Sequence, residues 1–166
     1  MSEQQLREEL YAAFRHRARL YYLFFDELRQ TLGELRAIEL LQRAIRRRGE
    51  EIGKKFAQFA PDDLAGLRDA FVGSVPDNGH MFAPAVERCD DKRLDITLQS
   101  CPLRDAWLED GLSPEEAATM CRIAAVVDEG TFAGAGFEFS ADTWAEHRQE
   151  CCRLHIEPGK GASRSS

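Results

Sequence analysis

Three cysteines spread along the second half of the chain are the residues best suited to chemistry. Cys101 lies where a strand-like segment ends and a helix begins, Cys121 lies within a helical pattern, and Cys152 lies on the last strand-like segment. Backbone N–H groups and the dipole of the following helix would favour a thiolate at Cys101. Cys101 is therefore the best candidate nucleophile, although a free cysteine is commonly a small buried hydrophobe.

Two carboxylates are the candidates for moving protons near these thiols. Asp128 comes just past the helical segment that carries Cys121, and Glu138 lies between two phenylalanines. A carboxyl group in either place could act as a general acid or base. The sequence identifies no partner for either of them, so both are candidates.

The last strand-like segment, residues 151–156, carries two cysteines on opposite faces. Side chains alternate in a strand, which places Cys152 with the core residues and predicts that Cys151 and His155 point together the other way. That pair could form a thiol–imidazole couple, the edge of a metal site, or a plain surface group. No cofactor is firmly implied, because the cysteine spacing matches no compact metal motif. If the fold assembled a zinc or iron site, its candidate ligands would be Cys101, Cys121, Cys152 and His155.

Two long helices and a short third are expected to open the chain and support these residues. Apolar residues recur at spacings of three and four over residues 6–28 and again over residues 35–59. The third helix follows aspartates at 62–63 that could cap it. Within the second helix, Gly49 and Gly53 are four residues apart, which predicts that another backbone packs closely there.

A small antiparallel sheet is expected in the second half, interrupted by a helical insertion. Residues 86–89 and 93–99 predict a hairpin, and residues 137–139 and 151–156 predict two further strands. The insertion contains Ser113-Pro114-Glu115-Glu116, which matches a helix capping box with proline at the first helical position. The predicted fold class is therefore α+β.

Composition limits the domain organisation and the partners. The 166 residues, 43% of them hydrophobic, suit a single domain over residues 1–158, followed by a Gly/Ser-rich tail, residues 159–166, expected to be disordered. A net charge of -7 argues against nucleic acid and anionic membranes as partners. With neither a signal-like start nor a membrane-spanning apolar run, we expect a cytoplasmic protein with reduced thiols and a small-molecule substrate. Its amphipathic helices could also form a homodimer.

The three cysteines also carry a resemblance to a known family. Cys101-Pro102-Leu103 after a strand, Cys121 in the next helix and Cys152 near the end are similar to the pattern of the L-2-amino-thiazoline-4-carboxylic acid hydrolases, and the resemblance covers residues 10–158. It implies an enzyme that opens the thiazoline ring of a cyclised cysteine derivative with water, giving carbamoyl-cysteine. It also maps Cys101, Cys121 and Cys152 onto the cysteine positions of the family.

The chain departs from that family pattern at several positions, and a second interpretation stays open. The pattern has an acidic residue three positions after the helical cysteine, where this chain has Ala124, and an aromatic residue where it has Leu154. The residues that frame the last hairpin, around Ser140 and residues 146–150, also differ. The alternative is a non-catalytic domain that binds a small molecule or a metal, similar to domains of the four-vinyl-reductase type.

Overall fold

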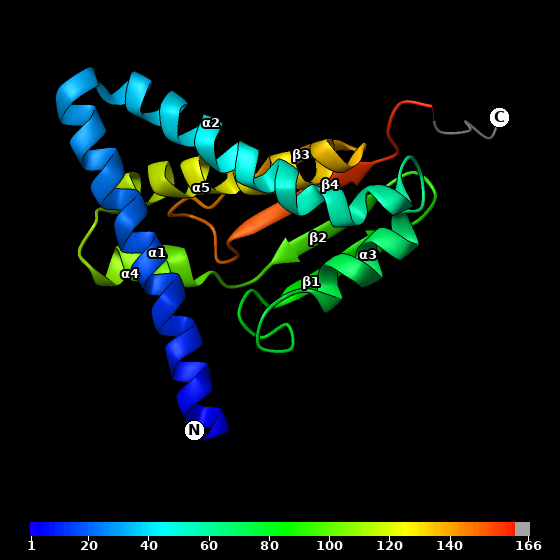
Figure 1. Ribbon diagram of the computed structural model, residues 1–166, viewed down its shortest axis with the longest axis horizontal. Helices are drawn as coiled ribbons and strands as arrows, with labels where there is room; N and C mark the ends of the chain where they lie inside the picture. Colours follow the sequence, from blue (N-terminus) through cyan, green and yellow to red (C-terminus); the bar gives the residue numbers. More distant parts are fainter. Residues whose placement is uncertain (162–166) are drawn as a thin grey trace.

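The computed structural model describes residues 1–161 and contains a four-stranded antiparallel sheet with helices packed against it (Figure 1). The helical elements are α1 (Glu3–Leu32), α2 (Glu34–Gly53), the 3-10 helix η1 (Lys54–Phe59), α3 (Leu64–Gly73), α4 (Pro102–Glu109) and α5 (Pro114–Ala135). The strands are β1 (Pro84–Cys89), β2 (Leu94–Leu98), β3 (Glu138–Asp142) and β4 (Cys152–Glu157). The predicted α+β class is confirmed, with α4 and α5 as the helical insertion between β2 and β3.

Local capping signals set several helix starts as the sequence predicts. The Ser113 hydroxyl accepts a hydrogen bond from the Glu116 backbone N–H, while the Glu116 carboxylate accepts one from the Ser113 N–H. This reciprocal pair satisfies two backbone donors that a helix leaves unpaired at its start. Asp63 caps α3 in the simpler way, through a bond from the Gly66 N–H. The confirmed capping box fixes the start of α5, the helix that carries Cys121.

The strand order β1-β2-β4-β3 places the last strand in the interior of the sheet. Cys152 at the start of β4 pairs with Leu98 at the end of β2, and the chain leaves β2 towards Cys101. One sheet face packs against α5, η1 and α3, and its most deeply buried side chains are Leu94, Ile96, Leu154 and Ile156. The topology therefore brings residues 98–101 next to the segment that enters β4.

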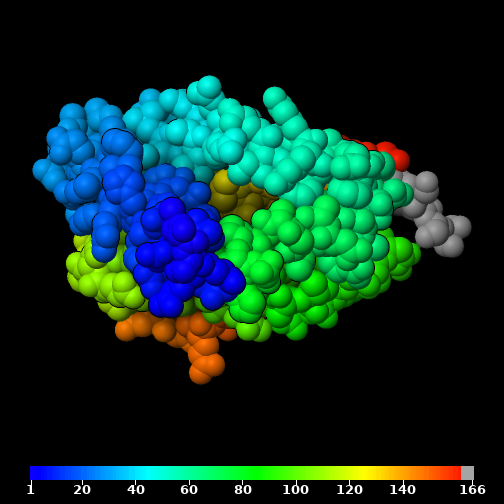
Figure 2. All heavy atoms as spheres, turned by 60° about the horizontal axis from the view of Figure 1, so that its bottom comes forward, coloured from blue at the N-terminus to red at the C-terminus, as the bar shows by residue number. Residues whose placement is uncertain are grey.

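Helices α2 and α5 lie side by side over much of their length (Figure 1), and glycines allow their backbones to touch. A Cβ atom at Gly130 would collide with the backbone oxygen of Arg46, and one at Gly49 would collide with that of Val127. Figure 2 shows part of α5 recessed between α2 and α3. The close approach predicted for Gly49 is confirmed, and its partner is α5.

We expect Gly130→Ala to lower the free energy of unfolding by about 1–3 kcal/mol, because the added methyl group forces two packed backbones apart. Urea unfolding followed by circular dichroism measures this loss. Gly73→Ala in α3 is the matched control, since a Cβ there meets no atom within 4 Å. The control should be neutral or gain up to ~1 kcal/mol from helix propensity. Equal stability of the two variants would contradict the close packing.

The C-terminal end of the described chain is hydrogen-bonded to the segment between η1 and α3. Gly159, the first residue of the predicted tail, is buried and donates its N–H to the Pro61 carbonyl at 2.8 Å, while residues 162–166 lie outside the described residues. No helix within residues 1–161 is long and apolar enough to cross a membrane.

On α1, Leu23 and Phe24 are exposed apolar side chains. The homodimer through amphipathic helices stays a prediction, and these side chains are the place to test it.

Candidate active site

The three cysteines singled out from the sequence meet in one cavity of about 210 Å³. The walls come from α4, α5, the end of β2, the loop between α3 and β1, and the segment that enters β4. The reactive or charged residues among its lining are Cys101, Cys121, Cys151, Cys152, Asp128, Arg104 and Arg17. Most other lining residues are apolar, including Phe71, Phe82, Leu98, Trp107 and Trp144. Its volume is below the ~300–1,000 Å³ typical of sites for drug-sized ligands, so it suits a small molecule.

Cys101 occupies the N-cap position of α4, directly before Pro102. Its sulfur forms no hydrogen bond of full capping geometry. Hydrogen bonding with the Cys151 thiol nevertheless lowers the pKa of Cys101 most, and the backbone N–H groups of Arg104 and Leu103 lower it further, against the opposing effect of burial. A thiol whose pKa is lowered has more of the nucleophilic thiolate at neutral pH. Cys101 is therefore the best candidate nucleophile in the cavity.

Cys151 lies in the cavity beside Cys101, so the prediction that it points away with His155 is wrong. It immediately precedes β4, where the alternation of strand side chains does not apply. Its N–H donates to the carbonyl of Leu98 at 2.9 Å, and the residue is 1% exposed. Hydrogen bonding to Cys101 and burial both raise the pKa of Cys151 far above its usual value. Cys151 thus stays a thiol and can donate a hydrogen bond to a Cys101 thiolate.

The other two cavity cysteines are poor nucleophiles. Burial raises the pKa of Cys152 to about 12, and burial likewise raises the pKa of Cys121 well above its ordinary range. Both groups therefore remain neutral thiols at physiological pH. They act as small, polarisable side chains in the cavity wall. The four cavity cysteines therefore divide into one activated sulfur and three protonated ones.

Asp128 is a carboxyl group in this cavity and lies within α5, not past its end as the sequence interpretation has it. It follows Cys121 by seven residues, two helical turns, so the two side chains share a face of the helix. That spacing is the signal that links them in the sequence. Burial raises the pKa of Asp128 to about 7. A carboxyl group with such a pKa can both donate and accept a proton near neutral pH.

Arg104 brings a positive charge to the cavity wall. Its Nε and Nη2 atoms donate to Oδ1 of Asp105 at 2.9 and 2.7 Å, and its guanidinium carbon lies 5.9 Å from the ring centroid of Trp144. The Arg104 side chain is only 14% exposed. Its Nη1 atom forms no hydrogen bond or ion pair within residues 1–161. That nitrogen is free to bind an anionic group of a ligand, and the sequence interpretation did not include it.

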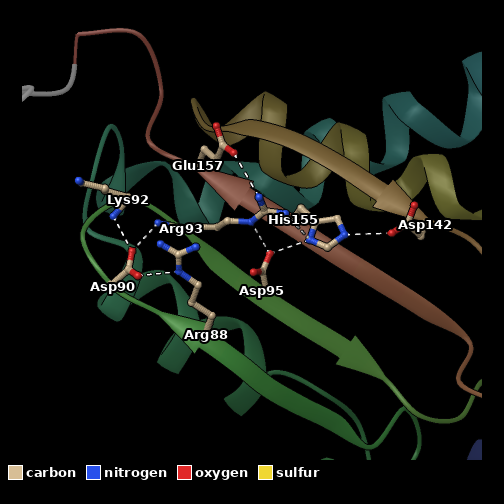
Figure 3. Close-up of polar contacts among 8 residues, drawn as sticks. All are labelled: Arg88, Asp90, Lys92, Arg93, Asp95, Asp142, His155 and Glu157. Atoms are coloured by element: carbon tan, nitrogen blue, oxygen red, sulfur yellow. Dashed lines mark hydrogen bonds and ion pairs between the residues drawn. The ribbon is translucent and has the colours of Figure 1, made fainter.

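Two other predicted site residues lie elsewhere. Glu138 is exposed on β3 and does not line the cavity. His155 lies on the opposite sheet face from the cavity, with Nδ1 2.6 Å from Oδ1 of Asp95 and Nε2 3.1 Å from Oδ2 of Asp142 (Figure 3). That face has a wider hollow of about 630 Å³, but its lining has no thiol and is mostly polar. We therefore regard the smaller cavity as the candidate active site.

The cavity does not resemble a metal centre. His155 cannot join the cysteines as a ligand, because it lies with Asp95 and Asp142 on the sheet face opposite the cavity. Within residues 1–161, no three His, Cys, Asp or Glu side chains are grouped as metal ligands would be. The fold thus does not bring together the candidate ligand set of Cys101, Cys121, Cys152 and His155.

The fold and cavity define a small α+β protein in which helices and one end of a sheet enclose a cavity lined by thiols and a carboxyl group. The family model described as L-2-amino-thiazoline-4-carboxylic acid hydrolase matches residues 13–156, which include every cysteine of the cavity. The chain belongs to the L-2-amino-thiazoline-4-carboxylic acid hydrolase family, as its sequence pattern predicts. No curated protein and no solved structure matches it.

Proposed function

We propose that this protein is a cysteine-dependent hydrolase that opens the ring of L-2-amino-thiazoline-4-carboxylate or a close analogue. The observation that carries the proposal is the pairing, in one small cavity, of a thiol with a lowered pKa and a carboxyl group with a raised one. Such opposite shifts are typical of a nucleophile and its proton-transfer partner. Family membership supports the reaction class.

In the proposed first step, the Cys101 thiolate attacks the amidine-like ring carbon between nitrogen and sulfur. The bond from that carbon to the ring sulfur then breaks, and protonated Asp128 supplies the proton that the departing sulfur needs. The hydrogen bond from Cys151 keeps Cys101 ionised before attack and stabilises it again when it departs. The result is an open-chain adduct attached to Cys101.

In the second step, water attacks the same carbon and Cys101 departs, which releases carbamoyl-cysteine. Ionised Asp128 accepts a proton from that water, so one carboxyl group is the acid of the first step and the base of the second. A pKa of about 7 allows both protonation states at neutral pH. The family pattern has an acidic residue where this chain has Ala124, which cannot transfer protons. In this proposal Asp128 is the general acid and base instead.

Arg104 is the proposed anchor for the substrate carboxylate. We expect Arg104→Gln to lower kcat/KM about 10- to 150-fold, mainly through KM, because a charge-assisted hydrogen bond contributes about 1.5–3 kcal/mol. The loss should disappear with 2-aminothiazoline, which lacks the carboxylate. Arg48→Gln is the control, since Arg48 is an exposed partner of Glu51 on α2, outside the cavity. An equal loss on both substrates would contradict the anchoring role.

The test of the proposed function is turnover of L-2-amino-thiazoline-4-carboxylate by the purified protein, with carbamoyl-cysteine detected by mass spectrometry. Turnover that survives a chelator would support a metal-independent hydrolase. Tight binding of the substrate without turnover would instead favour the alternative of a non-catalytic small-molecule-binding domain, for which the aromatic lining of the cavity is suited. Stoichiometric metal with protected thiols in the purified protein would argue against the nucleophile.

A further inference from the structure

The cavity contains a second thiol next to its nucleophile, on a chain segment held in place by backbone hydrogen bonding. The Cys151 N–H bonds to the carbonyl of Leu98, three residues before Cys101, and Leu98 pairs with Cys152 in the sheet. The two segments therefore run side by side where Cys101 and Cys151 line the cavity. Both thiols line the same cavity, and each is the largest influence on the pKa of the other, as expected of neighbouring sulfurs. A simple nucleophile needs one hydrogen-bond donor, but it does not need that donor to be a second cysteine.

We propose that Cys101 is a site of oxidation by peroxides and that Cys151 is its resolving thiol, so that the pair closes to a reversible disulfide. In the first step the Cys101 thiolate attacks one oxygen of hydrogen peroxide, the O–O bond breaks, the other oxygen leaves as hydroxide and is protonated to water, and Cys101 becomes a sulfenic acid. In the second step the Cys151 sulfur attacks the Cys101 sulfur, the S–O bond breaks, and the Cys151 proton leaves with the oxygen as water. Overall, two thiols lose two electrons and two protons, and hydrogen peroxide is reduced to two waters.

The surroundings of the pair favour this reaction at Cys101 over the other cysteines. Cys101 is half-buried and faces the cavity, so a molecule as small as hydrogen peroxide can reach it. Cys121 and Cys152 are protonated thiols, and thiols react with peroxides much more slowly than thiolates. Cys151 is almost inaccessible from solvent but adjacent to Cys101, which suits a thiol that reacts only after its neighbour is oxidised.

The disulfide would consume the nucleophile of the proposed hydrolase and switch it off until a reductant restores the thiols. Only this loss of turnover rests on the proposed function, because formation of the disulfide needs no substrate. A protein that forms the disulfide but hydrolyses nothing would retain the inference and lose the function. A protein that hydrolyses the thiazoline but never links these cysteines would do the reverse.

The test is peptide mapping by mass spectrometry of the full chain after hydrogen peroxide treatment and blocking of free thiols. We expect two of the five free thiols to be lost, a Cys101–Cys151 crosslink as the main product, and complete recovery with dithiothreitol. In Cys151→Ser, Cys101 should be trapped by dimedone as sulfenic acid and then oxidise irreversibly. Cys152→Ser is the matched control and should still form the crosslink.

Three results would overturn the proposal. The first is a main crosslink from Cys101 to Cys121 or Cys152. The second is oxidation of Cys101 in the native chain to sulfinic acid without any disulfide. The third is a Cys101 that peroxide leaves unmodified under conditions that oxidise free cysteine. Each of these results is measured on the protein with its native sequence, so the conclusion does not depend on whether the serine variants fold.

Discussion

Replacement of Cys101 by alanine is expected to lower kcat for thiazoline hydrolysis at least about 1,000-fold, because it removes the atom that forms the covalent bond. The other three cavity cysteines cannot substitute for it, since they are protonated at neutral pH. Cys101→Ser should be nearly as inactive, because a hydroxyl group at this position would not ionise. Steady-state kinetics with the thiazoline substrate measure the loss.

Cys89→Ala is the matched control for this prediction. Cys89 is a free cysteine at the end of β1 and does not line the cavity, so its removal should leave kcat within about twofold of the native value. Near-native activity of Cys101→Ala would rule out the nucleophilic mechanism even if the substrate is right. A Cys101→Ala protein that still binds the substrate would show that the loss lies in the chemical step.

Replacement of Asp128 by asparagine is expected to lower kcat about 100- to 10,000-fold, the usual effect of losing a general acid or base. In the native protein, activity in the ring-opening step should fall as the pH rises through about 7, because the carboxyl group loses the proton that it donates. The asparagine variant should lack this limb of the pH profile. Glu138→Gln, at the exposed carboxylate outside the cavity, should leave the rate and the profile unchanged.

The same Asp128 substitution should increase stability at high pH. The folded pKa of Asp128, about 7, exceeds the ~3.9 of an unfolded aspartate, so the folded state binds more protons between these values. Stability contributed by this group is therefore present at low pH and is lost as the pH rises to about 7. Because Asp128 is only partly buried, we expect Asp128→Asn to gain about 1–2 kcal/mol at pH 8 and little at pH 4.

Urea unfolding at the two pH values checks this expectation. A variant that loses activity and gains stability would mark Asp128 as a residue retained for function, since purely structural residues destabilise the fold when they are replaced. Loss of both activity and stability at pH 8 would contradict a carboxyl group whose pKa is raised by burial. The stability measurement thus separates a functional role from a structural one without any knowledge of the substrate.

Most of the fold was predictable from the sequence because its elements follow from local backbone rules. The spacing of apolar residues indicated α1 and α2, and the reciprocal side-chain and backbone bonds of a capping box indicated the start of α5. The position of Cys101 between a strand and a helix was equally local, and it suggested a lowered pKa before any neighbour was known. The three spaced cysteines were also enough to indicate the family.

The composition of the site was less predictable, because it depends on contacts between residues distant in the chain. Strand alternation failed for Cys151, since this residue lies in a bend just before β4 and not in the strand itself. Asp128 and Glu138 were equivalent in sequence, and only the continuation of α5 against the backbone of α2 put Asp128 in the cavity.

The sequence by itself determined the helices, the strands and the family, and it indicated Cys101 as the candidate nucleophile. Only the tertiary structure decided which thiol accompanies Cys101, which carboxyl group shares its cavity and which arginine lines the wall. The physical reason is that periodicity and capping act over one or two turns of chain. Hydrogen bonding to a neighbouring thiol lowers the pKa of Cys101, and desolvation raises that of Asp128, and both effects are properties of the whole packed cavity.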